Sequence, residues 1–129
     1  MNFFASSGVR SSVEAARNAL SDKIQYLTEF LGGEYEIQGA YPAWEYRKES
    51  PLRDKMVEVY ETMYGQKPEV VAIHAGLECG LFYKKIDGLD CVSLGPDMKD
   101  IHTSEEVLDI ASTERVWKYL VKVLEELKD

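Results

Sequence analysis

The chain has 129 residues, about one domain's worth and long enough to bury a core. Its hydrophobic content of 45% and charged content of 29% are ordinary for a soluble globular protein. A net charge of −8 argues against binding to nucleic acid or to an anionic membrane, because both require a basic surface. No apolar run approaches the roughly 18 residues that span a bilayer, and the first residues lack a signal-peptide pattern. We therefore expect a cytoplasmic protein with no nucleic-acid or membrane partner.

The two cysteines, Cys79 and Cys91, are too few to form a metal cage, and the sequence has no CxxC spacing. A single pair of cysteines in a chain without a secretory signal favours two reduced thiols over a disulfide.

The most secure element is a helix that follows an expected strand over residues 2–10. Ser11 and Glu14 form the capping-box pattern, in which each side chain accepts a hydrogen bond from an otherwise unpaired amide. Gly32 and Gly33 are suited to end this helix, because glycine adopts the left-handed C-cap conformation without steric cost. Between these signals, apolar residues recur every three or four positions on one helical face: Val13, Ala16, Leu20, Ile24, Leu27 and Leu31.

Three further helices are expected. Ser50 and Pro51 form a helix start, with a side-chain cap followed by proline at the first helical position, and Gly65 ends that helix. A short helix lies within residues 76–86, and Ser112 caps the final helix. The apolar stripes are Leu52, Met56, Val59, Tyr60 and Met63 in the second helix and Val116, Leu120, Val123, Leu124 and Leu127 in the last.

Strands are expected between these helices. Residues 34–41 alternate polar and apolar side chains, whereas residues 69–73 and 89–95 are unbroken apolar runs typical of a parallel sheet covered on both faces. Residues 96–110 indicate a polar loop. The expected class is α/β (α+β), with a β-α-β part followed by part of a layered α/β sheet. Each part has about two strands, fewer than a sheet normally needs, so either the parts pair or each lacks a partner.

His102 is a candidate metal ligand, because it is an imidazole in a polar loop beside carboxylates that could orient its ring. The alternative is a surface histidine, with Glu105 and Glu106 as a solvated pair. Catalytic zinc needs about three protein ligands. A mononuclear site from His102, His74 and one of Asp97, Glu105 or Glu106 would meet that number, although the spacing matches no known motif.

Other polar residues lie where ligands bind in α/β proteins. Glu78 follows the run 69–73, at the mouth of an expected parallel strand. It could act as an acid–base group, or it could be a carboxylate that accepts amide hydrogen bonds at a helix N-terminus. Gly76 and Gly80 would allow close approach of the backbone to a ligand or to a neighbouring strand. Arg10 could bind a carboxylate through two hydrogen bonds, or it could be a solvated charge. The sequence contains no phosphate loop, Rossmann fingerprint, nucleophile elbow or HExxH motif.

Several segments together resemble a known enzyme family. The sequences "HAGLECGLF", "SLGPDMKDIHTSEEVLDI" and "VWKYLVKVLEEL", in this order, are similar to the C-terminal end of the bacterial aminoacyl-histidine (Xaa-His) dipeptidases. These belong to the two-zinc metallopeptidases that include the carnosinases and aminoacylases. The upstream segments "FFASSGVRSSVEAARNAL" and "YPAWEY" also resemble that family, so the likeness extends over nearly the whole chain.

The resemblance implies roles for individual residues. His102 matches the family's C-terminal histidine, which ligates one of two zinc ions. Arg10 matches a lid arginine that binds the substrate's C-terminal carboxylate. Gly76 matches a position whose backbone touches substrate, and Glu78 lies in the same turn as a further candidate substrate-binding residue.

The resemblance also implies that this chain is a C-terminal fragment. The family's first zinc-binding histidine and aspartate and its catalytic glutamate have no match here, so we expect no catalytic residue and no dipeptide hydrolysis by the chain alone. Residues 1–45 would be half of a ferredoxin-like lid that mediates dimerisation, and residues 46–129 the C-terminal part of the catalytic α/β domain. We expect homo-oligomers through the lid or through exposed strand edges. The alternative is a non-catalytic α/β binding or oligomerisation module.

Overall fold

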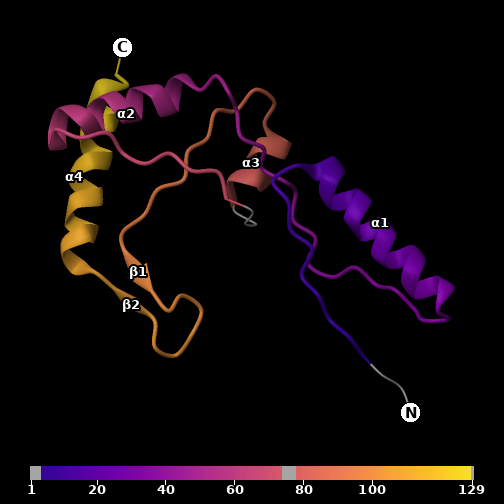
Figure 1. Ribbon diagram of the computed structural model, residues 1–129. Coiled ribbons are helices and arrows are strands. Elements are labelled where there is room, and N and C mark those ends of the chain that lie inside the picture. The colour runs from indigo at the N-terminus through magenta and orange to yellow at the C-terminus, as the bar shows by residue number, and fades with distance from the viewer. Residues whose placement is uncertain (1–3, 74–77, 129) are drawn as a thin grey trace. The chain divides into compact units, whose positions relative to one another are not determined.

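A computed structural model describes residues 4–73 and 78–128 of the chain. Two compact units are present, one from Met1–Lys48 and Val71–Leu89 and the other from Glu49–Val70 and Asp90–Asp129. Figure 1 shows the elements in chain order: α1 (Glu14–Phe30), α2 (Pro51–Tyr64), α3 (Glu78–Lys85), β1 (Met98–Lys99), β2 (Val107–Leu108) and α4 (Ile110–Glu126). No helix within the described residues is long and apolar enough to cross a membrane.

The four expected helices are all formed, but two begin elsewhere than the capping patterns predict. The capping box at Ser11 is wrong, because α1 begins at Glu14 with Val13 as an N-cap that makes no side-chain hydrogen bond. The Ser11 hydroxyl instead accepts a hydrogen bond from the Val13 N–H at 3.1 Å. At the start of α4, Asp109 is the N-cap, and its carboxylate accepts from the N–H of Ser112, the residue expected to be the cap.

The helix ends follow the glycine signals. Beyond α1, Gly32 has φ of +81° and the Gly33 N–H donates to the Thr28 carbonyl at 2.9 Å, as in a left-handed helix end. Beyond α2, Gly65 has φ of +70° and donates its N–H to the Glu61 carbonyl at 2.8 Å. These glycines therefore end both helices as the sequence predicts.

The core of the second unit lies between α2 and α4, which pack against each other. Its buried apolar residues are Met56 and Val59 from α2 and Tyr119 and Val123 from α4. The Tyr119 hydroxyl donates to the Met56 carbonyl at 2.7 Å, so the one polar atom of this apolar contact is satisfied.

The strands differ from the prediction. The only ladder in the described part of the chain is an antiparallel hairpin, in which Met98 pairs with Leu108 and Lys99 with Val107. This hairpin lies inside the stretch expected to be a polar loop. Within residues 4–10, 34–41, 69–73 and 89–95 no strand is formed, which corrects the four strands expected there. A strand is stabilised by hydrogen bonds to a neighbour, and these segments have no ladder partner in the described chain.

Candidate functional site

His102 lies in the loop that joins β1 to β2, within the second unit. Its side chain is exposed, and its backbone is left-handed with φ of +67°; Asp100, two residues earlier, has φ of +53°. A positive φ is uncommon outside glycine, although aspartate and histidine are enriched there. The sequence analysis predicted a polar loop at this position but not the left-handed conformation of His102.

Thr103 organises this loop through local hydrogen bonds. Its hydroxyl donates to the Asp100 carbonyl at 2.6 Å and accepts from the Glu105 N–H at 3.2 Å. Its backbone N–H also bonds to the Asp100 carbonyl, and its carbonyl accepts from the Glu106 N–H at 3.3 Å. These bonds shape the loop between the two short strands.

Glu106 contacts His102 through the main chain. Its Oε2 accepts a hydrogen bond from the His102 N–H at 2.7 Å. Glu105 and Glu106 are both exposed, as expected of a solvated pair, and Glu106 has this bond to the backbone in addition. Its carboxylate lies against the backbone of His102.

The described residues do not by themselves form a metal site. Within residues 4–73 and 78–128, no three histidine, cysteine, aspartate or glutamate side chains gather in a way that could hold an ion. The His102 imidazole makes no hydrogen bond or ion pair with any of these residues. Zinc would need about two further protein ligands beside this imidazole. His74, the other histidine of the expected mononuclear site, lies outside the described residues, as does Gly76.

Arg10 and Glu78 belong to the first unit. Arg10 is exposed and lies four residues before the start of α1. Glu78 is the exposed first residue of α3, where a carboxylate interacts favourably with the partial positive charge of the helix N-terminus. This position agrees with the helix-terminus alternative for Glu78.

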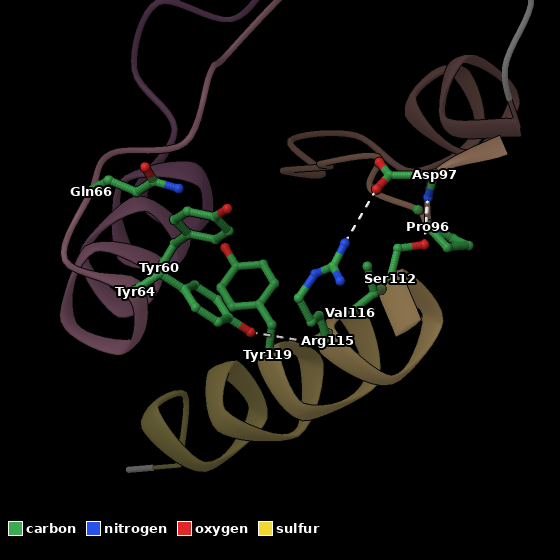
Figure 2. A pocket seen from close by; sticks show the side chains of 10 residues that line it. Tyr60, Tyr64, Gln66, Pro96, Asp97, Ser112, Arg115, Val116 and Tyr119 are labelled. Carbon is green, nitrogen blue, oxygen red and sulfur yellow. Dashed lines mark hydrogen bonds and ion pairs between the residues drawn. The ribbon is translucent and has the colours of Figure 1, made fainter. Parts of the chain in front are cut away.

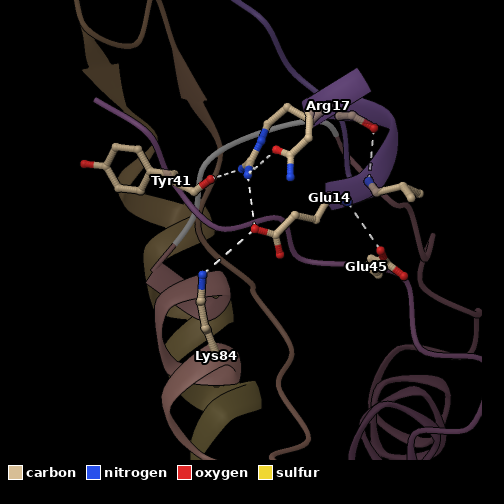
Figure 3. Close-up of polar contacts among 8 residues, drawn as sticks. Glu14, Arg17, Tyr41, Glu45 and Lys84 are labelled. Atoms are coloured by element: carbon tan, nitrogen blue, oxygen red, sulfur yellow. Dashed lines mark hydrogen bonds and ion pairs between the residues drawn. The ribbon is translucent and has the colours of Figure 1, made fainter. Parts of the chain in front are cut away.

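A polar cluster joins α1 to α3 within the first unit, as Figure 3 shows. The Glu14 carboxylate forms ion pairs with Arg17 at 3.2 Å and with Lys84 at 3.9 Å. Arg17 also donates to the Tyr41 carbonyl, and the Glu14 N–H donates to Glu45 Oε1 at 3.4 Å. Sequence analysis missed this cluster because its members are separated by up to 70 residues and have no shared motif.

Packing explains why the "HAGLECG" segment has a glycine at position 80. It is buried in α3, and a Cβ at this position would lie 2.9 Å from the Pro42 carbonyl oxygen and 3.5 Å from the Trp44 Cβ. A close approach of backbone at Gly80 is therefore present, but the neighbour is the irregular segment 42–44 of the same unit and not the strand that was expected.

The second unit also has an open hollow of about 320 Å³ beside α2 and α4, shown in Figure 2. Tyr60, Tyr64 and Tyr119 form much of its wall. Arg115 pairs with Asp97 at 3.3 Å across its edge, so the charged groups there are already partnered. Its described lining includes none of the site residues expected from the sequence: Arg10, Glu78 and His102.

No protein-family model matches the chain, but it is similar to known dipeptidases. The chain is 33% identical over 119 residues to the cytosol non-specific dipeptidase of Escherichia coli (strain K12), covering 92% of this chain and 24% of that protein. It also matches the crystal structure of aminoacylhistidine dipeptidase from Vibrio alginolyticus with a TM-score of 0.73 and 34% identity. This match covers 92% of this chain and 24% of that chain. The chain thus spans about a quarter of each relative.

Proposed function

Because this chain is related along nearly its whole length to a C-terminal portion of the aminoacylhistidine dipeptidases, we propose that it contributes part of a zinc-dependent dipeptidase site. The similarity of 92% of the chain to 24% of each dipeptidase is the observation that carries this proposal. The activity it serves is hydrolysis of aminoacyl-histidine dipeptides in the cytoplasm. Residues 1–45 belong to the lid of that enzyme and residues 46–129 to its catalytic domain.

His102 is the zinc ligand of this proposal. Its exposed imidazole makes no hydrogen bond or ion pair among the described residues, so its ring nitrogens are accessible to a metal ion. The donor type also suits zinc, which is bound by neutral imidazole nitrogen. Two zinc ions would serve the complete site. The remaining ligands and the catalytic glutamate would come from the part of the enzyme that this sequence does not match.

Arg10 is the proposed clamp for the substrate's C-terminal carboxylate, since a guanidinium offers two parallel donors to a carboxylate. Gly76 would let its backbone touch the substrate, and Glu78 lies near that turn at the start of α3. The chain alone would bind zinc weakly and leave dipeptides intact, because it supplies one metal ligand and no catalytic glutamate.

A chimera tests these roles directly. In the Escherichia coli dipeptidase, the matching quarter is replaced by this chain, and zinc content and aminoacyl-histidine hydrolysis are measured. We expect the chimera to be active, His102→Ala to lose activity and part of its zinc, and the exposed neighbour variant Ile101→Ala to keep both. Full activity and full zinc content in His102→Ala would contradict the proposal.

The same chimera tests Arg10. Replacing Arg10 by alanine should raise KM for a dipeptide with a free carboxylate by roughly tenfold or more, because a charge-assisted hydrogen bond contributes about 1.5–3 kcal/mol. A dipeptide with an amidated C-terminus should show little change. An equal effect on both substrates would show that Arg10 does not bind the carboxylate.

A further inference from the structure

The backbone of His102 needs a contact to hold it. A left-handed conformation at φ of +67° is unfavourable for a residue with a Cβ, and such conformations persist where surrounding contacts over-determine them. The hydrogen bonds centred on Thr103 connect Asp100, Glu105 and Glu106, and none of them is made by an atom of His102 itself. The Thr103 N–H bond to the Asp100 carbonyl closes a four-residue turn in which His102 is the third residue, a position where β-turns can place a positive φ. The turn accommodates the left-handed conformation, and a group bonded to the His102 N–H itself would hold it further.

Glu106 supplies that group. Its Oε2 accepts from the His102 N–H at 2.7 Å, a distance typical of a charge-assisted bond to a carboxylate. The two residues are four positions apart, at the beginning and the end of one tight loop, and β2 begins directly after Glu106. The strand thus anchors the residue whose carboxylate holds the His102 amide.

The imidazole remains available when the amide is held in this way. The His102 side chain is exposed and makes no hydrogen bond or ion pair within residues 4–73 and 78–128. We propose that Glu106 is a positioning residue, whose carboxylate fixes the left-handed backbone of His102 and so presents the imidazole from the hairpin loop for coordination. This inference rests on the proposed function of His102, and it gives Glu106 a role other than that of a metal ligand.

Nuclear magnetic resonance of the isolated chain tests the inference. A strong cross-peak between the amide proton and the Hα of the same residue is characteristic of positive φ, and we expect it at His102. Glu106→Ala should lose this signal, whereas Glu106→Gln should retain it because a carboxamide oxygen still accepts the hydrogen bond. Glu105→Ala is the matched control, since the Glu105 side chain makes no hydrogen bond with the described residues.

The thermal melt of the α2–α4 pair should be the same in all three variants, which separates a local change from unfolding. Retention of the His102 signal in Glu106→Ala would overturn the inference. Equal loss in Glu106→Gln and Glu106→Ala would overturn it as well, because the hydrogen bond would then not be the cause.

Zinc chloride added to the same samples reports separately on the proposed function. Zinc should shift the His102 imidazole signals of the unmodified chain, and Glu106→Ala should weaken this binding by roughly 10- to 100-fold, as loss of an orienting partner does. Absence of any zinc shift in the unmodified chain would contradict the role of His102 in the dipeptidase. The cross-peak would still decide the role of Glu106.

Discussion

At the scale of single residues, packing and hydrogen bonding explain two positions that the sequence pattern alone left open. Gly80 is buried in α3, where the Pro42 carbonyl leaves no room for a side chain. Tyr119 was not among the apolar residues expected to face the core from the last helix, yet it is buried there, and its hydroxyl donates a hydrogen bond to the Met56 carbonyl. Contacts between distant segments decide both roles, so the local sequence indicated Gly80 without its neighbour and did not indicate Tyr119.

Replacing Gly80 by alanine should destabilise the first unit. Alanine favours a helix over glycine by about 1 kcal/mol, but a Cβ at 2.9 Å from the Pro42 oxygen forces a shift that costs about 1–3 kcal/mol. We expect a lower urea midpoint by Trp44 fluorescence in a Trp117→Phe background. Gly8→Ala is the control, because its Cβ would meet only Arg10 Nε at 4.0 Å. A raised midpoint in Gly80→Ala would contradict the close approach.

Replacing Tyr119 by phenylalanine should destabilise the second unit by about 1 kcal/mol, the usual net worth of a buried neutral hydrogen bond. Trp117 fluorescence during urea unfolding, in a Trp44→Phe background, measures the change. Tyr64→Phe is the matched variant, and its smaller expected effect reflects a longer and exposed bond to the Arg115 carbonyl at 3.2 Å. An equal loss in the two variants would contradict the assignment of the buried bond.

The same tyrosine predicts a pH dependence. Burial raises the pKa of the Tyr119 phenol above its ordinary value near 10, and the neighbouring Tyr60 and Tyr64 raise it further. The folded state therefore disfavours the phenolate, so this contribution to stability is present below about pH 10 and is lost as the pH rises through the folded pKa. Tyr119→Phe should lose less stability between about pH 8 and about pH 11 than the unmodified chain. An identical alkaline loss in both proteins would contradict the buried phenol.

At the scale of elements, helices were predictable because their signals are local. Apolar residues spaced by three or four positions located α1, α2 and α4, and Gly32 and Gly65 end two of these helices. The helix starts were harder to predict. The Ser11 hydroxyl bonds to Val13, and Asp109 takes the capping position that Ser112 could have filled, because several polar residues compete for the same amides.

One cap was predicted correctly and can be tested. Ser50 accepts from the Arg53 N–H at 3.1 Å, donates to Asp90 Oδ1 at 2.7 Å and is buried. Ser50→Ala should therefore cost the second unit about 1–2 kcal/mol, seen as a lower melting temperature by circular dichroism. Ser93→Ala, at an exposed position of the same unit, should leave the melt unchanged. A Ser50→Ala melt equal to that of the parent would contradict the capping role.

At the scale of the whole molecule, strands were not predictable from composition because a strand forms only beside a partner segment, and local sequence does not identify that partner. The runs 69–73 and 89–95 have the composition of buried strands, yet they form no ladder in the described chain. Val71 is 62% exposed and Ile73 50% exposed. The candidate site shows the same limit: His102 was proposed from its loop and from the resemblance, but no set of further ligands gathers around it in the described residues.

Exposed apolar segments predict self-association. Unpaired backbone and apolar side chains along an extended segment favour pairing with another chain. We expect sedimentation velocity to show oligomers that grow with protein concentration, and Val71→Lys to reduce them because a charge disfavours edge pairing. A soluble monomer with a single cooperative melt at all concentrations would instead favour a self-contained module.

The central claim is that this chain carries one zinc ligand of a dipeptidase but not the machinery for catalysis. The most direct test is hydrolysis of an aminoacyl-histidine dipeptide by the purified chain in the presence of added zinc. We predict no release of histidine above the rate in buffer. Clear turnover that disappears when a chelator removes the metal would contradict the claim.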